Sequence, residues 1–110
     1  MKIVYIAGPY SGNVKENIFK ANNIASMLAE NNIGFICPHM NSANMETITS
    51  ESFFLNMYLE ILKRCDAVLL LEGYENSKGT QGELKLAYEL GIVVFMPYEF
   101  DALIRWYNND

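Results

Sequence analysis

One stretch, residues 65–96, constrains the fold of this chain more than any other. Two apolar runs, residues 67–71 and 92–96, are each long enough for a buried strand, and a helical stretch at residues 79–90 lies between them. A polar loop precedes the helix, and Gly91 follows it, at the position where helices commonly end. This succession predicts a strand–loop–helix–strand unit whose two strands pair in parallel.

The rest of the chain continues this alternation of apolar runs and helical patterns. Short apolar runs indicate strands, whereas apolar residues at a spacing of three and four indicate the buried face of a helix. The further predicted elements are strands at residues 2–7 and 35–37 and helices at residues 14–31, 50–64 and 101–106.

Right-handed crossovers between parallel strands produce an open sheet with helices on both faces. We therefore expect a three-layer α/β fold of the flavodoxin-like type, with strand order 2-1-3-4, as one domain over residues 1–110. Such sheets bind ligands beyond the carboxyl ends of their strands, at the switch point between the first and third strands. The loops expected there are residues 8–12, 38–49, 72–78 and 97–100. Asp66 opens the third strand at the opposite end, so we expect it to be structural.

Composition and charge narrow the classes of partner. The formal net charge is −5 and no basic cluster occurs, so neither a nucleic acid nor an anionic membrane is the expected partner. Two cysteines, Cys37 and Cys65, do not make a disulfide framework. A single histidine, His39, and the lack of a CxxC pair argue against a metal site, and we expect no cofactor. A small molecule is the partner class that remains.

Two longer-range expectations follow from the pattern of apolar residues. No apolar run approaches the ~20 residues of a membrane span and the start lacks a signal-peptide pattern, so we expect a cytoplasmic protein. The helix at residues 50–64 has an apolar face wider than one sheet contact requires, which indicates a partner subunit and a homo-oligomer.

The polar loop at residues 39–49 has a length typical of functional or mobile loops.

One carboxylate, Glu83, falls in the predicted first turn of the helix at residues 79–90. Thr80 and Glu83 have the spacing of a capping box, in which the glutamate reaches back to the cap amide. Alternatively, the helix amides keep Glu83 ionised at the switch point, where it serves as a nucleophile or stabilises an oxocarbenium-like centre. Gly82 would leave room for a ring to approach. The spacing alone leaves both interpretations open.

Residues 5–12, YIAGPYSG, and residues 65–92 resemble the nucleoside 2-deoxyribosyltransferase family. This family includes 2'-deoxynucleoside 5'-phosphate N-hydrolases and short phage and bacterial members of unassigned function. The resemblance covers most of the chain in element order. It implies that Glu83 attacks the anomeric carbon of a deoxyribose, that Tyr5 lies close to Glu83, and that Ser77 contacts the sugar or a 5'-phosphate. From the resemblance, the loop residues Gly8, Pro9, Tyr10 and Ser11 are also expected to touch the sugar, phosphate or base. Gly79 and Gly82 are the remaining residues predicted to bind substrate.

The sequence departs from the family pattern at the residue that helps to protonate the leaving base. Tyr58 stands where the family has an aspartate, and a phenol is a poor general acid at neutral pH. His39 and Glu72 are the candidates for a replacement, although a lone loop histidine is more often a surface residue. Tyr74 is expected either to stack on a nucleobase or to be an exposed loop aromatic. No arginine or lysine occurs between residues 8 and 13 to hold a phosphate.

The leading hypothesis is an enzyme that cleaves the N-glycosidic bond of a (deoxy)nucleoside or nucleoside 5'-monophosphate, by hydrolysis or by base transfer. The alternative is a nucleotide-binding or sensing module of the same fold with weak or lost catalysis. Residues 79–83 also partly match a motif of the nucleoside monophosphate phosphoribohydrolases. A purely structural oligomeric scaffold ranks last, because it leaves the convergent loops unexplained.

Overall fold

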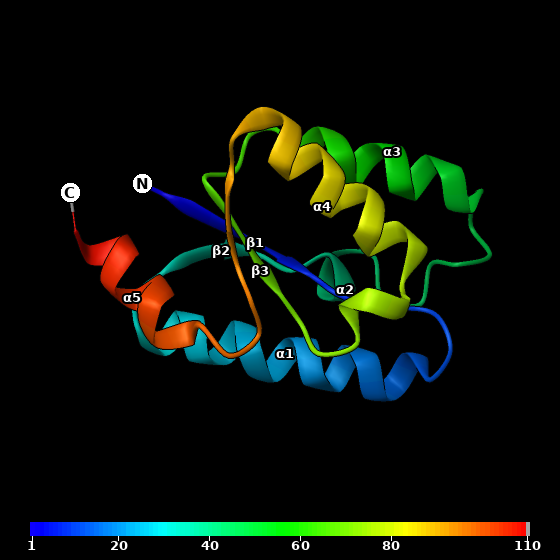
Figure 1. The fold of residues 1–110 in the computed structure, drawn as a ribbon. Coiled ribbons are helices and arrows are strands. Elements are labelled where there is room, and N and C mark those ends of the chain that lie inside the picture. Colours follow the sequence, from blue (N-terminus) through cyan, green and yellow to red (C-terminus); the bar gives the residue numbers. More distant parts are fainter. Residues whose placement is uncertain (110) are drawn as a thin grey trace.

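A computed structural model describes residues 1–109 and has a four-stranded parallel sheet at its centre (Figure 1). The strands run in the order β2-β1-β3-β4, which confirms the predicted flavodoxin-like topology. Tyr5 on the central strand pairs with Ile36 on one side and with Val68 on the other. The strands are β1 (Ile3–Ala7), β2 (Gly34–Ile36), β3 (Ala67–Leu70) and β4 (Val93–Phe95).

Helices cover both faces of the sheet, as predicted for a three-layer fold (Figure 1). One face carries α1 and α5, and the other carries α3 and α4. The helices are α1 (Val14–Glu30), α2 (Pro38–Asn41), α3 (Glu51–Leu62), α4 (Lys78–Leu90) and α5 (Phe100–Asn108), with a 3-10 turn η1 (Tyr74–Asn76).

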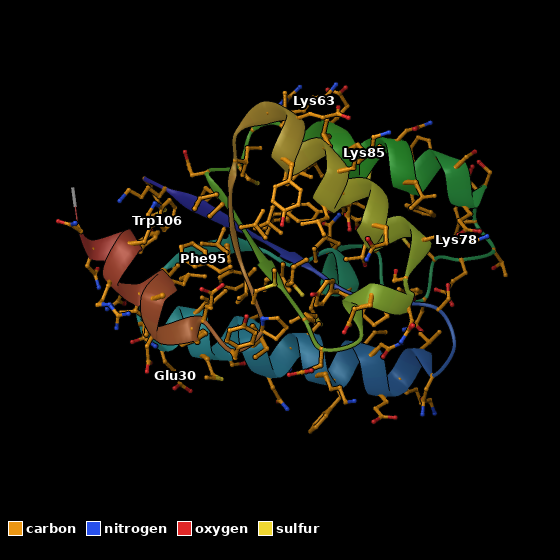
Figure 2. All side chains as sticks on the ribbon, viewed as in Figure 1. Glu30, Lys63, Lys78, Lys85, Phe95 and Trp106 are labelled. Atoms are coloured by element: carbon orange, nitrogen blue, oxygen red, sulfur yellow. The ribbon has the colours of Figure 1, made fainter. Side chains whose placement is uncertain are left out.

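The apolar run of β3 is buried on both of its faces, because side chains alternate between the two helical layers. Leu69 packs in the cluster beneath α1 and α5, whereas Val68 and Leu70 pack in the cluster beneath α3 and α4. At the edge of the first cluster, the rings of Phe95 and Trp106 lie 5.6 Å apart, centroid to centroid (Figure 2). Burial on both sides explains why this strand has no polar residue.

Gly8 directly follows β1, and only glycine fits there. A Cβ atom at this position would lie 2.6 Å from the Cβ of Leu71, so the loop after β1 lies directly against the end of β3. Gly91 ends α4 with a φ of 70°, in the left-handed region that favours glycine. Gly8 therefore fixes how the loop after β1 leaves the sheet, and Gly91 fixes how the chain returns from α4 to the sheet.

Most element boundaries lie within two residues of the sequence-based expectation, and two differences bear on the site. The loop predicted at residues 39–49 contains α2, a single turn that begins with Pro38 at its first position. One turn has too few residues to show a helical period, so periodicity does not reveal it. In addition, α4 begins at Lys78 and not at residue 79, because Ser77 caps it by accepting a hydrogen bond from the Thr80 amide at 3.2 Å.

Asp66 has the structural role expected of it. Its carboxylate accepts a hydrogen bond from the backbone N–H of Ile3 at 2.8 Å, which ties the start of β1 to the start of β3. Across residues 1–109, none of the helices has both the length and the apolar character needed to cross a membrane.

Candidate active site

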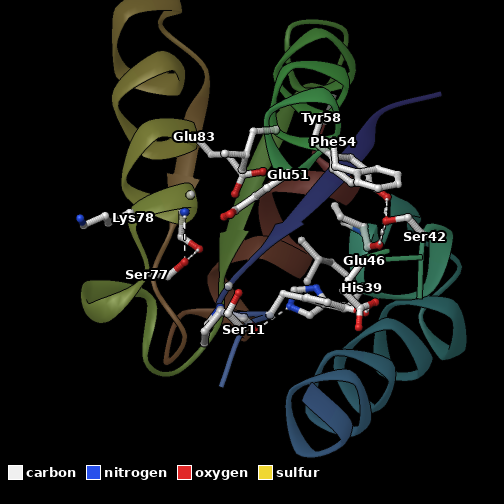
Figure 3. Close-up of a pocket in the computed structure, with 18 of the residues that line it drawn as sticks. Ser11, His39, Ser42, Glu46, Glu51, Phe54, Tyr58, Ser77, Lys78 and Glu83 are labelled. Carbon is white, nitrogen blue, oxygen red and sulfur yellow. Dashed lines mark hydrogen bonds between the residues drawn. The ribbon is translucent and has the colours of Figure 1, made fainter. Parts of the chain in front are cut away.

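A cavity of about 500 Å³ opens beyond the carboxyl end of β1, between α2, α3 and the start of α4 (Figure 3). This is the switch point at which a ligand site is expected in such a sheet. Most of the predicted site residues line the cavity: Gly8, Pro9, Tyr10, Ser11, His39, Ser77, Gly79 and Glu83. The topology therefore brings these residues together from three separate segments of the chain.

Tyr5 and Glu83 form a pair at the base of this cavity. Tyr5 is fully buried on β1, and its hydroxyl group donates a hydrogen bond to the carboxylate of Glu83 on α4. Burial, followed by the nearby Glu83 carboxylate, holds the pKa of Tyr5 far above its usual range. The phenol is thus a fixed hydrogen-bond donor, and it orients the carboxylate at the cavity surface.

The surroundings of Glu83 make it a weaker acid than expected. Burial raises the pKa of Glu83 to about 7, although the hydrogen bond from Tyr5 acts in the opposite direction. Because α4 starts at Lys78, Glu83 lies in the second turn, where the helix dipole no longer dominates. The expectation of a carboxylate kept ionised by helix amides is therefore wrong. Both protonation states of Glu83 are populated near neutral pH.

The capping-box interpretation of Glu83 is also wrong. Ser77 is the cap of α4, and its Oγ accepts hydrogen bonds from the Thr80 amide at 3.2 Å and from the Thr80 hydroxyl at 2.9 Å. Glu83 bonds to Tyr5 instead of reaching back to the cap. The hydrogen of the Ser77 hydroxyl group is not used in these two bonds. Because Ser77 lines the cavity, this hydroxyl group can donate a hydrogen bond to a bound molecule.

His39 lines the cavity but is not arranged as a proton donor. The side chain is buried on α2, and its Nε2 lies 2.8 Å from the Pro9 carbonyl oxygen, which makes Nε2 the protonated nitrogen. Burial lowers the pKa of His39, and the carbonyl groups of Pro9 and Gly8 only partly offset this. Nδ1 has no hydrogen-bond partner among residues 1–109 and is an acceptor in the neutral ring.

Tyr58 lines the cavity, but its hydroxyl group is saturated with hydrogen bonds. It donates to the Pro38 carbonyl at 3.1 Å and accepts from the Asn41 amide at 3.2 Å. Ser42 Oγ lies 2.6 Å away and takes the second acceptor position, as the dashed line in Figure 3 shows. A phenol offers one donor and two acceptor positions, so Tyr58 anchors α2 to α3 and has none left for a ligand.

Glu46 and Tyr10 form a pair that the sequence analysis did not identify as such. The Tyr10 hydroxyl donates to Glu46 Oε1 at 2.5 Å and accepts from the Asn44 backbone N–H at 3.0 Å. Glu46 lines the cavity together with Glu51 and Phe54. The only sequence signal for Glu46 is that it belongs to the long polar loop expected to be functional or mobile.

Besides Tyr5, which lies beneath the cavity, three residues considered for the site are not part of its lining. Tyr74 packs against the cluster beneath α3 and α4, and its hydroxyl group lies 3.7 Å from the sulfur of Met96. Gly82 is exposed on α4, and a Cβ atom there would meet nothing within 4 Å. Glu72 is exposed and does not line the cavity. Within residues 1–109, no three His, Cys, Asp or Glu side chains cluster in a way that could hold a metal ion.

The sheet order and the switch-point cavity define a flavodoxin-like α/β protein with a candidate ligand site, and comparison with solved structures agrees on the fold. The structure is similar to a 2-deoxyribosyltransferase from Leishmania mexicana, with a TM-score of 0.63 and 25% sequence identity. It is also similar to a 2-deoxyribosyltransferase from the psychrotolerant bacterium Bacillus psychrosaccharolyticus, with a TM-score of 0.68 and 22% identity. The chain belongs to the family described as domain of unknown function DUF4406, whose model matches residues 2–96.

The extent of these matches differs. The Leishmania match covers 87% of this chain but only 63% of that enzyme, so the chain spans less than two thirds of it. The Bacillus match covers 86% of this chain and 70% of the other, and at 22% identity it establishes the fold alone. No curated protein matches the chain.

Proposed function

We propose that the protein cleaves the N-glycosidic bond of a (deoxy)nucleoside or nucleoside 5'-monophosphate, by hydrolysis or by transfer to a second base. The observation that carries this proposal is the Tyr5–Glu83 pair at the base of the switch-point cavity. The names of the two similar enzymes, both 2-deoxyribosyltransferases, support the same substrate class.

In the proposed reaction the ionised carboxylate of Glu83 attacks the anomeric carbon of the sugar. The C1'–N bond breaks, its electron pair leaves with the base, and a C1'–O bond to Glu83 forms. Water or a second base then attacks C1' and releases the carboxylate. Tyr5 holds the Glu83 oxygen in position before the reaction begins. The attacking carboxylate therefore loses less freedom of motion on reaching the transition state.

The near-neutral pKa of Glu83 suits this role. A half-buried carboxylate has lost part of its hydration, so its charge interacts strongly with the positive charge that develops on the sugar. The form that attacks is the ionised one, so activity is expected to rise with pH through about 7.

A binding or sensing module is the second candidate function, and one observation favours it. Tyr58 has no free hydrogen-bonding capacity, the His39 Nε2–H is used by Pro9, and Glu72 is exposed outside the cavity. None of these three residues is arranged to protonate a departing base. If no other group does so, the pocket binds a nucleoside without efficient turnover.

We also propose that the protein is cytoplasmic, forms a homo-oligomer and acts on a small molecule. On α3, Phe53 is 53% exposed and Leu55 is 40% exposed, and Leu55 also lines the cavity. Apolar side chains this exposed beside a site are typical of a surface that a second subunit covers.

The experiment that tests the proposal compares the wild-type protein with Glu83→Ala. Each is incubated with a panel of deoxynucleosides and their 5'-monophosphates, and released base is followed by chromatography. Release by the wild type and none by Glu83→Ala is the expected result, and the preferred panel member defines the phosphate requirement. Equal release by both proteins contradicts the role of Glu83, and binding without release supports the sensing module.

A further inference from the structure

The far wall of the cavity carries hydrogen-bond acceptors at the place where a nucleobase would lie. In a displacement at the anomeric carbon, the nucleophile attacks on the side opposite the leaving group. With Glu83 against the sugar, the base therefore points away from α4. Figure 3 shows Glu83 on α4 at one side of the cavity, whereas Glu46 and His39 lie with α2 at the other side.

Glu46 is the charged group on that wall, and it is held in place. Its Oε1 accepts the 2.5 Å hydrogen bond from Tyr10, and the Tyr10 hydroxyl is itself fixed by the Asn44 backbone N–H at 3.0 Å. The second oxygen, Oε2, has no hydrogen bond among the described residues and can accept one from a ligand. Because Tyr10 restrains the carboxylate, little side-chain freedom is lost when a ligand binds it.

The other polar side chains of the wall do not supply donors. Ser42 donates to the saturated Tyr58 hydroxyl, and the His39 Nε2–H is used by the Pro9 carbonyl. The Lys78 side chain, which borders the cavity at the start of α4, is directed away from it in Figure 3. A matching ligand must therefore present donors to this wall.

We propose that Glu46 accepts a hydrogen bond from the amino group of the nucleobase, so that the site selects adenine and cytosine over their oxo counterparts. This inference rests on the proposed nucleoside site and adds the class of base. The 6-amino group of adenine and the 4-amino group of cytosine are donors, whereas hypoxanthine and uracil place a carbonyl oxygen at the same position. A carbonyl oxygen facing a carboxylate leaves two acceptors opposed, which costs binding.

The test uses substrate pairs that differ only in this group: deoxyadenosine with deoxyinosine, and deoxycytidine with deoxyuridine. We expect the wild type to favour the amino member of each pair by about tenfold to a hundredfold in kcat/KM, as for a hydrogen bond to a charged group. Glu46→Gln removes the charge and adds a donor, so it should abolish or reverse the preference. Glu30→Gln, on the exposed end of α1, should leave the preference unchanged.

Glu51→Gln tests whether the base preference comes from a direct contact with Glu46 or from the overall negative charge of the cavity. An equal loss of preference in Glu51→Gln and Glu46→Gln would overturn the inference, as would a wild type that treats the pairs alike. If the wild type releases no base at all, the proposed catalytic function fails. In that case, calorimetry measures the binding of deoxyadenosine and deoxyinosine to the wild type and to Glu46→Gln. Tighter binding of deoxyadenosine by the wild type alone supports the inference, whereas equal binding of the two nucleosides, or no binding, overturns it.

Discussion

The hydroxyl group of Tyr5 and the carboxylate of Glu83 are hydrogen-bonded across 78 positions of sequence, from the central strand to the second turn of α4. Tyr5 is fully buried, whereas Glu83 reaches the cavity surface. The strand thus holds the Glu83 carboxylate in place from one side, and the carboxylate faces the cavity on the other. A change in either residue alters both the protonation of Glu83 and its orientation.

Tyr5→Phe removes the donor from this pair. The hydrogen bond lowers the pKa of Glu83, so its loss should move that pKa above about 7 and shift the rise of the pH–rate profile to higher pH. Activity at pH 7 should fall by about tenfold or more, since a charge-assisted hydrogen bond contributes ~1.5–3 kcal/mol. The measurement is kcat/KM between pH 5 and 9. A loss of kcat/KM that is equal at every pH would show that Tyr5 orients the Glu83 carboxylate without altering its pKa.

The raised pKa of Glu83 also makes stability depend on pH. The ordinary pKa of a glutamate is 4.5 and the folded value is about 7, so between these values the folded state holds more protons than the unfolded state. Stability from this group is therefore present at low pH and is lost as pH rises toward and through about 7.

Glu83→Gln should remove this dependence, because glutamine does not titrate. We expect the melting temperatures of the wild type and Glu83→Gln to be close at pH 5, and the variant to melt at the higher temperature at pH 8. Thermal unfolding at several pH values measures this. A difference between the two proteins that does not change with pH would contradict the burial of this carboxylate.

Ser77→Ala should have two separable effects, because Ser77 both caps α4 and lines the cavity. Loss of the cap should lower the free energy of unfolding by about 1 kcal/mol. Ser50 is the matched control, since it caps α3 through the Phe53 amide at 3.2 Å but does not line the cavity. Ser50→Ala should cost similar stability and leave KM unchanged, whereas Ser77→Ala should also raise KM. Unchanged KM in both would assign Ser77 to capping only.

Gly8→Ala and Gly82→Ala should change stability in opposite directions. A methyl group at Gly8 meets Leu71 at 2.6 Å, so this substitution should destabilise the fold by about 1–3 kcal/mol and distort the site loop. A methyl group at Gly82 meets nothing within 4 Å, and alanine favours a helix over glycine by about 1 kcal/mol. Denaturant unfolding measures both changes. Loss of activity in Gly82→Ala would place that residue in the site after all.

The sequence was sufficient to predict the sheet, because β3 is an apolar run that begins directly after Asp66 and ends at a polar loop containing Gly73. It did not reveal α2, since a single turn has no period, nor did it reveal the Ser77 cap that starts α4 one residue early. The nearness of Tyr5 to Glu83 came from the family resemblance alone. No local pattern links residues that far apart.

The hydrogen-bond partners within the site were the least predictable. The sequence placed His39 and Tyr58 near the site, but whether their polar atoms are free depends on the Pro9 and Pro38 carbonyls that face them. The pairing of Tyr10 with Glu46 likewise joins two loops whose relative position only the folded chain sets.

The central claim is that Glu83 forms a covalent bond to the anomeric carbon. Its most direct test is intact-protein mass spectrometry of wild type and Glu83→Gln, quenched in acid within one turnover of a cleavable deoxynucleoside. We expect the wild type to gain the mass of one deoxyribosyl group, with peptide mapping to Glu83, and the variant to gain none. Base release by the wild type without any adduct, or an adduct on another residue, would contradict the claim.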